Sequence, residues 1–520
     1  LILLATTVGE IDLLEEGLIS GESSLIPKPT ELIRKVTQSV GSSRQGCLIS
    51  SACTSSSMAL IVAGNLLALG RETSVLVVAC DAVTEFAIAG FGTMAALASS
   101  PGKPFHKDRD GLNLGDGAGW MWLVRDDYAK SRAIPAKAHL CGWSTQGDHY
   151  HMTAPHPGGA GLASAMSLSM QAAHVQPKDV VTVCAHGTGT KYNDDMELCA
   201  YEQIFGSHRC PIFSVKGGIG HTLGAAGLIE AVIAIESLHR KQSPPSIGFD
   251  DAEPKGESRI FNTARVLDKS GVALSTNAGF GGINTSLIVS LNPSEAPAIS
   301  KERRASRLVA MSWADEHECG FVQPGRPPIT ILRPAENDLN PALFPQAYKN
   351  WGRLSSLSKK IAYALALASR EMNRESQGLL PWGILSGNTK GCQTDNMVYF
   401  KDYLDNGRLL ARGNLFVYTL PTGPIAEASI HFRLAGPLFH VVQGSEDFKL
   451  MMDWADGFIA AGDARGMVAV STERARIVCA FLTPGAEAAG PEWRTADARL
   501  RSGDDWLKWY ASGDPEEGKA

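Results

Sequence analysis

The sequence predicts an α/β fold built from layers of helices and strands. Short apolar runs with strand character alternate with helical patterns from residue 1 to about residue 291. Clear strand-like runs cover residues 74–80, 180–185 and 274–276. Such alternation is typical of layered α/β proteins. With 520 residues, 44% of them hydrophobic, and 53 glycines, the chain can bury a large core in two or more domains.

The sequence divides into four parts. Residues 1–291 form a first α/β domain, and residues 307–485 form a second. Between them, residues 292–306 are polar, with two prolines and a basic cluster, which predicts a linker. Residues 486–520 are predicted to be a polar tail whose scattered tryptophans can dock on the rest of the protein. The chain opens directly on a strand-like run, so we expect that further strands of the fold precede it.

The second domain repeats part of the first. A shift of 392 residues lays residues 29–81 on residues 421–473 without a gap. Few residues are identical, but the order of strand, turn, helix, glycine and strand stays in step. In this alignment Ser445 occupies the position of Cys53.

Composition and charge exclude several classes of function. A net charge of -6 gives no general case for nucleic-acid binding. The 10 cysteines include no CxxC pair, which disfavours a zinc site or a disulfide framework and favours a reducing cytoplasm. No apolar run reaches the roughly 18 residues that a membrane helix needs. We therefore expect a soluble, cytoplasmic protein with no membrane span.

Cys53 is the first candidate for a catalytic residue. It lies in Ser-Ser-Ala-Cys-Thr-Ser-Ser-Ser, between an apolar run over residues 47–50 and a helical pattern over residues 58–69. A thiol at a helix start faces unpaired backbone N–H groups and the positive end of the helix dipole, so we expect a lowered pKa and a nucleophilic thiolate. The alternative is a small core residue, as many intracellular cysteines are.

Three later motifs could supply partners for this nucleophile. His186 follows an apolar strand in Ala-His-Gly-Thr-Gly-Thr, where a Gly-rich turn can hold the ring in a cleft. Lys216 and His221 belong to Ser-Val-Lys-Gly-Gly-Ile-Gly-His. Phe280 lies in Asn-Ala-Gly-Phe-Gly-Gly-Ile-Asn, whose glycines free backbone N–H groups for an oxyanion. Each motif alone fits an ordinary structural role, but their order favours one shared site.

Together these motifs resemble those of β-ketoacyl synthases of the thiolase superfamily. The resemblance covers residues 1–291 and rests on SACTSSS, HGTGT, KGGIGHTLGAAG and GFGGIN, with support from residues 103–119 and 148–155. It implies a thiolase-like layered α-β-α-β-α fold with a Cys-His-His site. Residues 307–485 carry a weaker likeness to the N-terminal half of that fold, which implies a second, partial thiolase-like α/β domain.

The resemblance implies a 3-oxoacyl-(acyl-carrier-protein) synthase. Cys53 would carry an acyl chain as a thioester, while His186 and His221 would stabilise the enolate that malonyl-acyl carrier protein forms as CO2 leaves. Lys216 would order the histidines. The product would be a 3-oxoacyl chain two carbons longer, in fatty acid or polyene or polyketide biosynthesis. Substrates would arrive on the phosphopantetheine of acyl carrier protein, and no cofactor would be needed.

The resemblance also implies which residues surround the reacting thioester. The oxyanion hole is expected at the backbone N–H groups of Cys53 and Phe280, beside Gly279 and Gly281. The acyl pocket is expected at Ala278, Thr188 and Thr190. Ala278 stands where related synthases often carry a phenylalanine, which could widen or lengthen the pocket, and Asp116 replaces a more usual glutamate.

The resemblance also bears on metals and partners. His149, His151 and His156 have the spacing of metal ligands, but residues 148–155 match a segment of the family, so we expect no metal. The expected partner is acyl carrier protein. A homodimer, or a heterodimer with another ketoacyl-synthase-like subunit, is also expected.

Two alternatives remain open. A Cys-His peptidase could use Cys53, His186 and Asn284, but it leaves Lys216 and His221 without a role. A non-catalytic assembly subunit is the other alternative. Ser445 and the absence of a second HGTGT motif favour such a role for the second domain, which could influence chain length or simply complete an interface.

Overall fold

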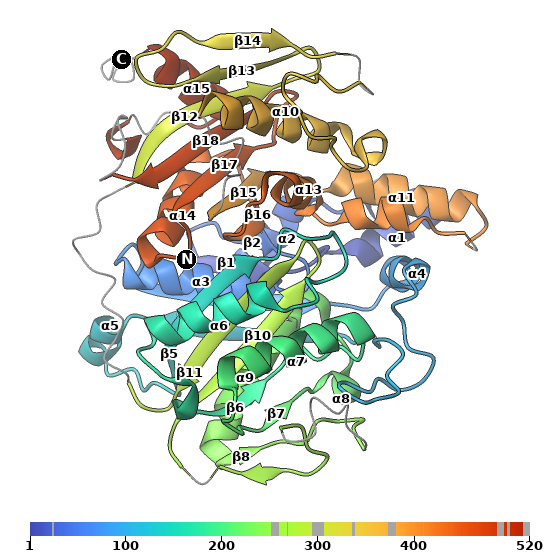
Figure 1. Cartoon of the computed structure of the whole chain (residues 1–520), viewed down its shortest axis with the longest axis vertical. Helices are drawn as coiled ribbons and strands as arrows, with labels where there is room; N and C mark the ends of the chain where they lie inside the picture. Colours follow the sequence, from blue (N-terminus) through green and yellow to red (C-terminus); the bar gives the residue numbers. More distant parts are fainter. Residues whose placement is uncertain are drawn as a thin grey trace.

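The computed structural model describes residues 1–22, 25–250, 259–267, 269–293, 306–334, 338–372, 381–408, 410–485, 493–496 and 500–512. Three α/β units lie along the long axis of the molecule (Figure 1). The unit of residues 306–512 is at the top, residues 1–124 lie in the middle, and residues 139–290 are at the bottom. Most of the predicted linker, residues 294–305, lies outside the described residues.

The upper and middle units share one sheet of 11 strands in the order β14-β13-β12-β18-β17-β15-β16-β2-β1-β3-β4. The middle unit contributes β1 (Ile2–Ala5), β2 (Cys47–Ser50), β3 (Ser74–Asp81) and β4 (Gly117–Val124). The upper unit contributes β12 (Ser306–Ala314), β13 (Glu318–Val322), β14 (Ile329–Leu332), β15 (Trp382–Asn388), β16 (Leu438–Val442), β17 (Gly466–Ser471) and β18 (Ile477–Pro484).

The lower unit has its own sheet of 5 strands in the order β5-β11-β10-β6-β7. Its strands are β5 (His139–Gly147), β6 (Val180–Cys184), β7 (Ile212–Phe213), β10 (Val272–Gly279) and β11 (Ile283–Ser290). A short pair, β8 (Gln242–Ser243) and β9 (Arg265–Val266), lies apart from it.

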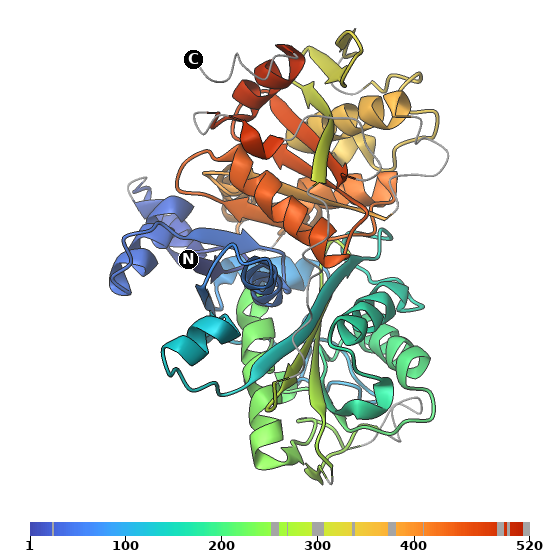
Figure 2. The same ribbon diagram turned by 90° about the vertical axis from the view of Figure 1, so that its left-hand side faces the viewer.

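Two helices, α3 (Ser55–Ala68) and α9 (Ala226–Arg240), lie between the two sheets and contact each other. Every residue of α3 from Ser55 to Leu67 is buried, as expected for a helix covered on all sides. Helices α6 (Ala160–Ala172) and α7 (Lys191–Phe205) cover the opposite face of the lower sheet (Figure 2). This order of helix and strand layers confirms the predicted layered α/β fold.

The remaining helices cover the outside of the large sheet or join its strands. In the middle unit these are α1 (Ile11–Ser20), α2 (Pro29–Ser39), α4 (Glu85–Thr93) and α5 (Asp126–Ser131), with α8 (Lys216–Ile219) in the lower unit. The upper unit has α10 (Ser356–Glu371), α11 (Gln393–Asp405), α12 (Gly413–Phe416), α13 (Gly423–Phe432), α14 (Phe448–Ala461) and α15 (Gly503–Ser512). None of the helices in the described ranges combines the length and apolarity that a bilayer crossing requires.

The repeat shifted by 392 residues is present in the structure. Helix α13, strand β16, helix α14 and strand β17 repeat α2, β2, α3 and β3 in the same order. The two copies meet through β2 and β16, which pair antiparallel with Ile49 opposite Val441. Val441 lies 392 residues after Ile49, so each strand faces its own repeat across a pseudo-twofold axis. Self-complementary contacts of this kind usually join two subunits, and here they join two parts of one chain.

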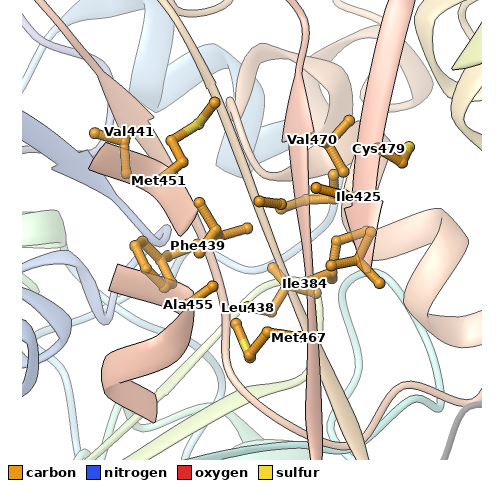
Figure 3. Close-up of a cluster of buried hydrophobic side chains, with 14 of the residues drawn as sticks. Ile384, Ile425, Leu438, Phe439, Val441, Met451, Ala455, Met467, Val470 and Cys479 are labelled. Atoms are coloured by element: carbon orange, nitrogen blue, oxygen red, sulfur yellow. The ribbon is translucent and has the colours of Figure 1, made fainter. Parts of the chain in front are cut away.

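The upper unit shares one dense apolar core with the middle unit, and Figure 3 shows a part of it in the upper unit. The side chains come from four neighbouring strands and the two helices that cover them. The labelled residues are Ile384, Ile425, Leu438, Phe439, Val441, Met451, Ala455, Met467, Val470 and Cys479, and all of them are buried. The second domain is therefore a packed unit.

The described part of the predicted tail contains two buried tryptophans. Trp493 and Trp506 are each 0% exposed, and the indole of Trp493 donates to the carbonyl of Ser306 at 3.2 Å. Helix α15 carries Trp506 and also Tyr510, whose hydroxyl donates to the carbonyl of Leu308 at 3.2 Å. The described part of the tail therefore packs on the upper unit.

β4 is an edge strand of the large sheet in the described part of the chain. It pairs antiparallel with β3, and its Trp120 and Trp122 are 67% and 50% exposed. β4 therefore presents two large apolar side chains on one face.

Candidate active site

Cys53 lies in the tight turn that joins β2 to α3. Strand β2 covers residues 47–50 as predicted, while α3 begins at Ser55, before the helical pattern expected from residue 58. Ala52 adopts a left-handed φ of 49°, which turns the chain sharply before the cysteine. The hydroxyl of Thr54 donates to the carbonyl of Ser51 at 2.6 Å and helps to hold the turn. The predicted placement of Cys53 at a strand-to-helix turn is confirmed.

The protonation state of Cys53 differs from the sequence prediction. Burial raises the pKa of the thiol to about 12, although Lys216 and the backbone N–H groups of Cys53 and Phe280 oppose the shift. At such a pKa the thiol is protonated at pH 7. The expected free thiolate is wrong, because the dry surroundings outweigh the helix N-terminus. The proton must therefore leave the sulfur when a substrate is bound.

Two of the expected oxyanion donors face the sulfur. The backbone N–H groups of Cys53 and Phe280 both lower the pKa of the thiol, as donors near the sulfur do. Gly279 has no side chain there, and an added Cβ would lie 3.4 Å from the Cys53 nitrogen. The neighbouring N–H of Gly281 is engaged elsewhere, since it donates to the carbonyl of Met152 at 2.7 Å. The glycine turn thus leaves the Phe280 N–H, and not that of Gly281, directed at the nucleophile.

His186 leaves β6 at a turn that a buried carboxylate holds. Glu197 of α7 accepts the N–H of His186 at 2.9 Å and the N–H of Gly187 at 2.6 Å. Gly187 has a φ of 41°, a left-handed value that favours glycine at this point. The ring position of His186 is therefore set by a helix that follows it in the chain.

Lys216 belongs to a buried network beneath His186. Its ammonium group donates to the His186 carbonyl at 2.7 Å and lies 3.3 Å from Nδ1 of the same residue. Glu230 of α9 forms an ion pair with Lys216 and also accepts from the side chain of Asn277. The lysine is thus paired and enclosed, which agrees with its expected ordering role.

His221 lies next to His186, with the two rings perpendicular at 86° and their centroids 5.2 Å apart. Its backbone is held on both sides, because its N–H donates to Asn113 and its carbonyl accepts from Gly115. Both ring nitrogens of His221 are buried and have no hydrogen-bond partner within the described ranges. Unpaired buried polar atoms are costly, so these nitrogens indicate a place for a polar substrate group.

Both histidines are neutral at physiological pH. Burial holds the pKa of His186 well below its usual value, and the charge of Lys216 lowers the pKa further. The same two causes act in the same order on His221. A neutral imidazole can donate one N–H bond to a developing oxyanion. The pair is therefore suited to stabilising negative charge.

The thiol of Cys53 opens into a narrow apolar hollow, which we call the Cys53 pocket. Its lining residues come from the loops after β1 and β2, from α4, from the loops after His221 and Gly279, and from the upper unit. They are Thr7, Val8, Ala52, Cys53, Phe86, Ala87, Phe91, Leu223, Phe280, Phe416 and Leu420. Phe416 and Leu420 belong to the second domain, so both domains contribute to the wall of this pocket.

The residues predicted for the acyl pocket lie elsewhere. Thr188 and Thr190 are bonded to each other through their hydroxyl groups at 2.9 Å at the start of α7. Ala278 packs in the core of the lower unit with Leu162 and Met166. Because neighbouring side chains of a strand point to opposite faces, Ala278 faces away when Asn277 faces His186. These three residues do not line the Cys53 pocket.

The segment that begins at residue 103 packs against the His186 loop. Asp194 accepts the backbone N–H of Phe105 at 2.7 Å, and the Arg109 guanidinium donates to Asp195 at 2.7 Å. Asp116, on the surface, accepts the N–H of Val83. This segment supports the histidine loop from outside the site.

The residues of the rival peptidase do not form a triad. The side chain of Asn284 donates to Asp148 at 3.0 Å and to the carbonyl of Gly282 at 3.3 Å. The side-chain amide that lies near His186 is that of Asn277, at 3.4 Å. The closely spaced histidines also have ordinary contacts, since Nδ1 of His151 accepts two backbone N–H groups and His156 packs on Tyr150.

Several functional residues were missed at the level of the sequence. Glu230 and Asn277 form the network under His186. Glu230 lies in a helix outside the quoted motifs, and Asn277 opens the glycine motif of Phe280, where nothing local indicates its contact with Glu230. Phe416 lies more than 360 residues after Cys53 and reaches it only through tertiary structure. Glu197 gave the one usable signal, as a polar residue shortly after the HGTGT turn.

A buried thiol near two backbone N–H groups, together with a pair of buried imidazoles, fits the class of condensing acyltransferases. Two family models agree with this class, namely the N-terminal domain of β-ketoacyl synthase over residues 36–129 and its C-terminal domain over residues 137–250. The 3-oxoacyl-[acyl-carrier-protein] synthase 2 of Vibrio harveyi is 35% identical over 306 residues, covering 54% of this chain and 72% of that protein. The synthase 2 of Vibrio cholerae serotype O1 is 36% identical over 251 residues, covering 46% and 61%. The chain belongs to the β-ketoacyl synthase family.

Solved structures show the same fold. The PfaC keto synthase–chain length factor matches with a TM-score of 0.71 at 16% identity, covering 94% of this chain and 66% of that chain. That match extends over both domains and shows the fold alone. The AntDE:AntF structure, a type II PKS acyl-carrier protein in complex with its ketosynthase, matches with a TM-score of 0.52 at 25% identity, covering 56% and 77%.

Proposed function

We propose that this chain catalyses decarboxylative Claisen condensation between an acyl thioester on Cys53 and malonyl-acyl carrier protein. In the first half-reaction the Cys53 sulfur attacks the acyl-carrier thioester, the thiol proton passes to the departing carrier thiol, and the acyl group moves to Cys53. In the second, malonyl loses CO2 and the C–C bond electrons form an enolate. The enolate carbon then attacks the acyl carbonyl, the C–S bond to Cys53 breaks, and a 3-oxoacyl-acyl carrier protein leaves.

The observation that carries the proposal is the pair of buried, neutral histidines. The unpartnered ring nitrogens of His221 can reach a substrate oxygen, and the perpendicular ring of His186 lies 5.2 Å away. Two N–H donors aimed at one thioester oxygen stabilise the enolate as CO2 leaves. The N–H groups of Cys53 and Phe280 would in turn hold the oxyanion formed when the enolate attacks. One such donor is worth roughly 3 kcal/mol in comparable acyl-transfer sites.

Acyl carrier protein is the proposed partner, and no cofactor is proposed. The relatives are 3-oxoacyl-[acyl-carrier-protein] synthases by name, and AntDE:AntF shows a ketosynthase bound to such a carrier. A further ketoacyl-synthase-like subunit is also proposed as a partner, but it would have to use a surface other than β2, which already pairs with β16. The cytoplasmic location belongs to the proposal as well and rests on the spacing of the 10 cysteines, which include no CxxC pair.

Mass spectrometry tests this function. After mixing with an acyl-carrier protein thioester, an acyl adduct is expected on Cys53. After addition of malonyl-acyl carrier protein, a 3-oxoacyl product two carbons longer is expected. Ser445→Ala serves as the matched control and should show both. A protein that forms neither adduct nor product contradicts the proposal.

For the second domain we propose a role in chain length. Phe416 lies in the Cys53 pocket, with its ring centroid 5.5 Å from that of Phe91. The packing is tight, since a Cβ added at Gly90 would come within 2.1 Å of the Phe416 ring. A bulky ring supplied by the second domain can therefore stop an acyl chain growing from Cys53.

Substitution of Phe416 by alanine tests this role. We expect the product ladder from malonyl-acyl carrier protein to move to longer chains, because the substitution removes an aromatic wall of the pocket. Leu410, which is 69% exposed, offers a control in the same domain as Leu410→Ala. An unchanged ladder for Phe416→Ala would leave the second domain with an interface role only.

A further inference from the structure

Asp81, the last residue of β3, is buried beside the active site but takes no part in the reaction described above. It is 7% exposed. The Thr6 hydroxyl donates to its Oδ1 at 2.5 Å, and the backbone N–H groups of Thr7 and Gly224 donate to its Oδ2 at 2.9 and 2.7 Å. The three donors come from two separate loops, one after β1 and one after His221. Asp81 therefore ties these two loops together.

The loop after β1 is in contact with the nucleophile turn. The Thr7 hydroxyl donates to the carbonyl of Ala52 at 3.3 Å, next to Cys53. The Ser50 hydroxyl donates to the carbonyl of Thr7 at 3.1 Å. Thr7 therefore makes two hydrogen bonds to the nucleophile turn, one through its hydroxyl and one through its carbonyl. A shift of Thr7 would move the turn that carries Cys53.

The second loop carries the histidine. Gly224 comes three residues after His221, and Leu223 between them has a φ of 50° and lines the Cys53 pocket. A Cβ added at Gly224 would lie 2.6 Å from Oδ2 of Asp81 and 2.7 Å from the Thr7 nitrogen. The loop is therefore pressed against the carboxylate, which limits its movement.

We propose that Asp81 is a positioning residue that holds the Cys53 turn and the His221 loop at the separation that condensation requires. The catalytic consequence rests on the proposed function. The three hydrogen bonds to Asp81, which we call the Asp81 clamp, do not depend on it. Condensation brings the acyl thioester on Cys53 and the malonyl thioester together between the Cys53 turn and the His221 loop. A small movement of one loop relative to the other should therefore slow the reaction. A misplacement of about 1 Å can cost about 100-fold in rate.

The charge of Asp81 can be separated from its hydrogen bonds. Burial raises the pKa of this carboxyl to about 6, and its charge acts on the thiols of Cys53 and Cys80 by raising their pKa. Lys216 is the cation that acts on Cys53 in the opposite direction. In Asp81→Asn the amide oxygen can accept from Thr7 and Gly224, and the amide N–H can donate to the Thr6 hydroxyl. This variant keeps the clamp and removes the charge.

The experiment compares Asp81→Ala and Asp81→Asn with the wild type in three measurements. These are the condensation rate, the rate of Cys53 alkylation by iodoacetamide, and amide hydrogen exchange at Thr7 and Gly224. Asp81→Ala is expected to slow condensation about 100-fold, with a much smaller effect on alkylation and faster exchange at both amides. Asp81→Asn should restore most of the rate and the protection, and alkylate somewhat faster because the charge is gone. Asp12→Ala, on the exposed side of α1, is the control.

Each of three results would overturn the proposal. They are wild-type condensation by Asp81→Ala, unchanged exchange at Thr7 and Gly224, and an equal loss of alkylation and condensation, which would indicate general unfolding. If Asp81→Ala does not fold, Thr6→Val is used instead, because it removes one of the three bonds. This variant should show slower condensation and faster amide exchange, both to a smaller degree. Wild-type condensation and exchange in Thr6→Val would also overturn the proposal. If the wild type itself does not condense, the proposed function fails, while hydrogen exchange still decides whether the clamp exists.

Discussion

The Cys53 turn and the Ser445 turn have the same place in their repeats but opposite surroundings. Each follows a central strand and precedes a helix, β2 and α3 in one case and β16 and α14 in the other. Cys53 is buried, whereas Ser445 is exposed. Cys53 lies under an apolar pocket that Leu223, two residues after His221, also lines. The shared order of strand, turn and helix therefore supplies only the position, and the neighbours supply the chemistry.

The helix starts differ in a way that matches this contrast. At α14 the Asp447 side chain accepts the N–H of Leu450 at 3.1 Å and so caps the helix. At α3 the Thr54 side chain does not cap the helix, because its hydroxyl donates back to Ser51. Capping groups occupy N–H donors that an active site could use. The second turn is thus built for stability, and the first leaves its donors available.

Replacement of the two turn residues should give the largest contrast. Cys53→Ala is expected to lower acyl transfer by about 10³-fold or more, because the residue that forms the covalent intermediate is gone. Ser445→Ala should leave the rate unchanged. Single-turnover transfer from an acyl-carrier thioester measures both. Comparable losses in the two variants would contradict the assignment of catalysis to the first copy.

Buried histidines in the two domains provide the next contrast. His221→Ala should slow condensation about 100-fold, since one enolate donor is lost, while acylation of Cys53 continues. His440 of the second domain bonds to the Ser386 hydroxyl at 2.8 Å, so His440→Ala should reduce stability rather than chemistry. Separate assays of acylation and condensation, with thermal unfolding, test the pair. Equal loss of acylation and condensation in His221→Ala would show that the histidine is not specific to the enolate step.

The buried lysine predicts a change in pH dependence. Lys216 lowers the pKa of His186 and His221, so both rings stay neutral as the pH falls. In the double variant Lys216→Met with Glu230→Gln, both pKa values should rise. The rings would then protonate at a higher pH, and condensation should be lost earlier on acidification. The acid limb of the pH–rate profile measures this shift, and a limb that stays in place or moves to lower pH would refute the role of Lys216.

The cap of the second turn predicts the smallest effect. Asp447→Ala should lower the free energy of unfolding by about 1 kcal/mol, because the first turn of α14 loses a hydrogen bond. The rate of condensation should not change. Chemical denaturation measures the effect, with Ser445→Ala as the neighbouring control. Unchanged stability would mean that the cap contributes nothing to this turn.

The sequence predicted the parts of the site that lie in local motifs. The strand before Cys53, the glycine turns around His186 and Phe280, and the spacing of Lys216 and His221 all appear in short stretches of chain. Glycine and proline positions restrict the backbone locally, so such turns are visible without a fold. The shifted repeat was also visible in the sequence. The order of its strand and helix patterns is kept although few residues are identical.

Other features depended on residues that are distant in the chain. Thr188 and Thr190 were expected in the pocket from the family resemblance, but their hydroxyl groups bond to each other just before helix α7. Phe416 was not expected because the second domain reaches the Cys53 pocket only after β16 pairs with β2. The ionisation of Cys53 was also misjudged. A helix start is a local feature, whereas burial is the sum of everything packed around it.

By itself the sequence singled out Cys53, the two histidines and Lys216 as the site residues, and it revealed the duplication of the turn. These follow from residue type and spacing, which act over a few residues. The tertiary structure alone decided the walls of the Cys53 pocket, the neutral state of the thiol and the histidines, and the pairing of the two copies across a pseudo-twofold axis. Desolvation and packing are properties of the whole assembly of elements, so no segment of the chain carries them alone.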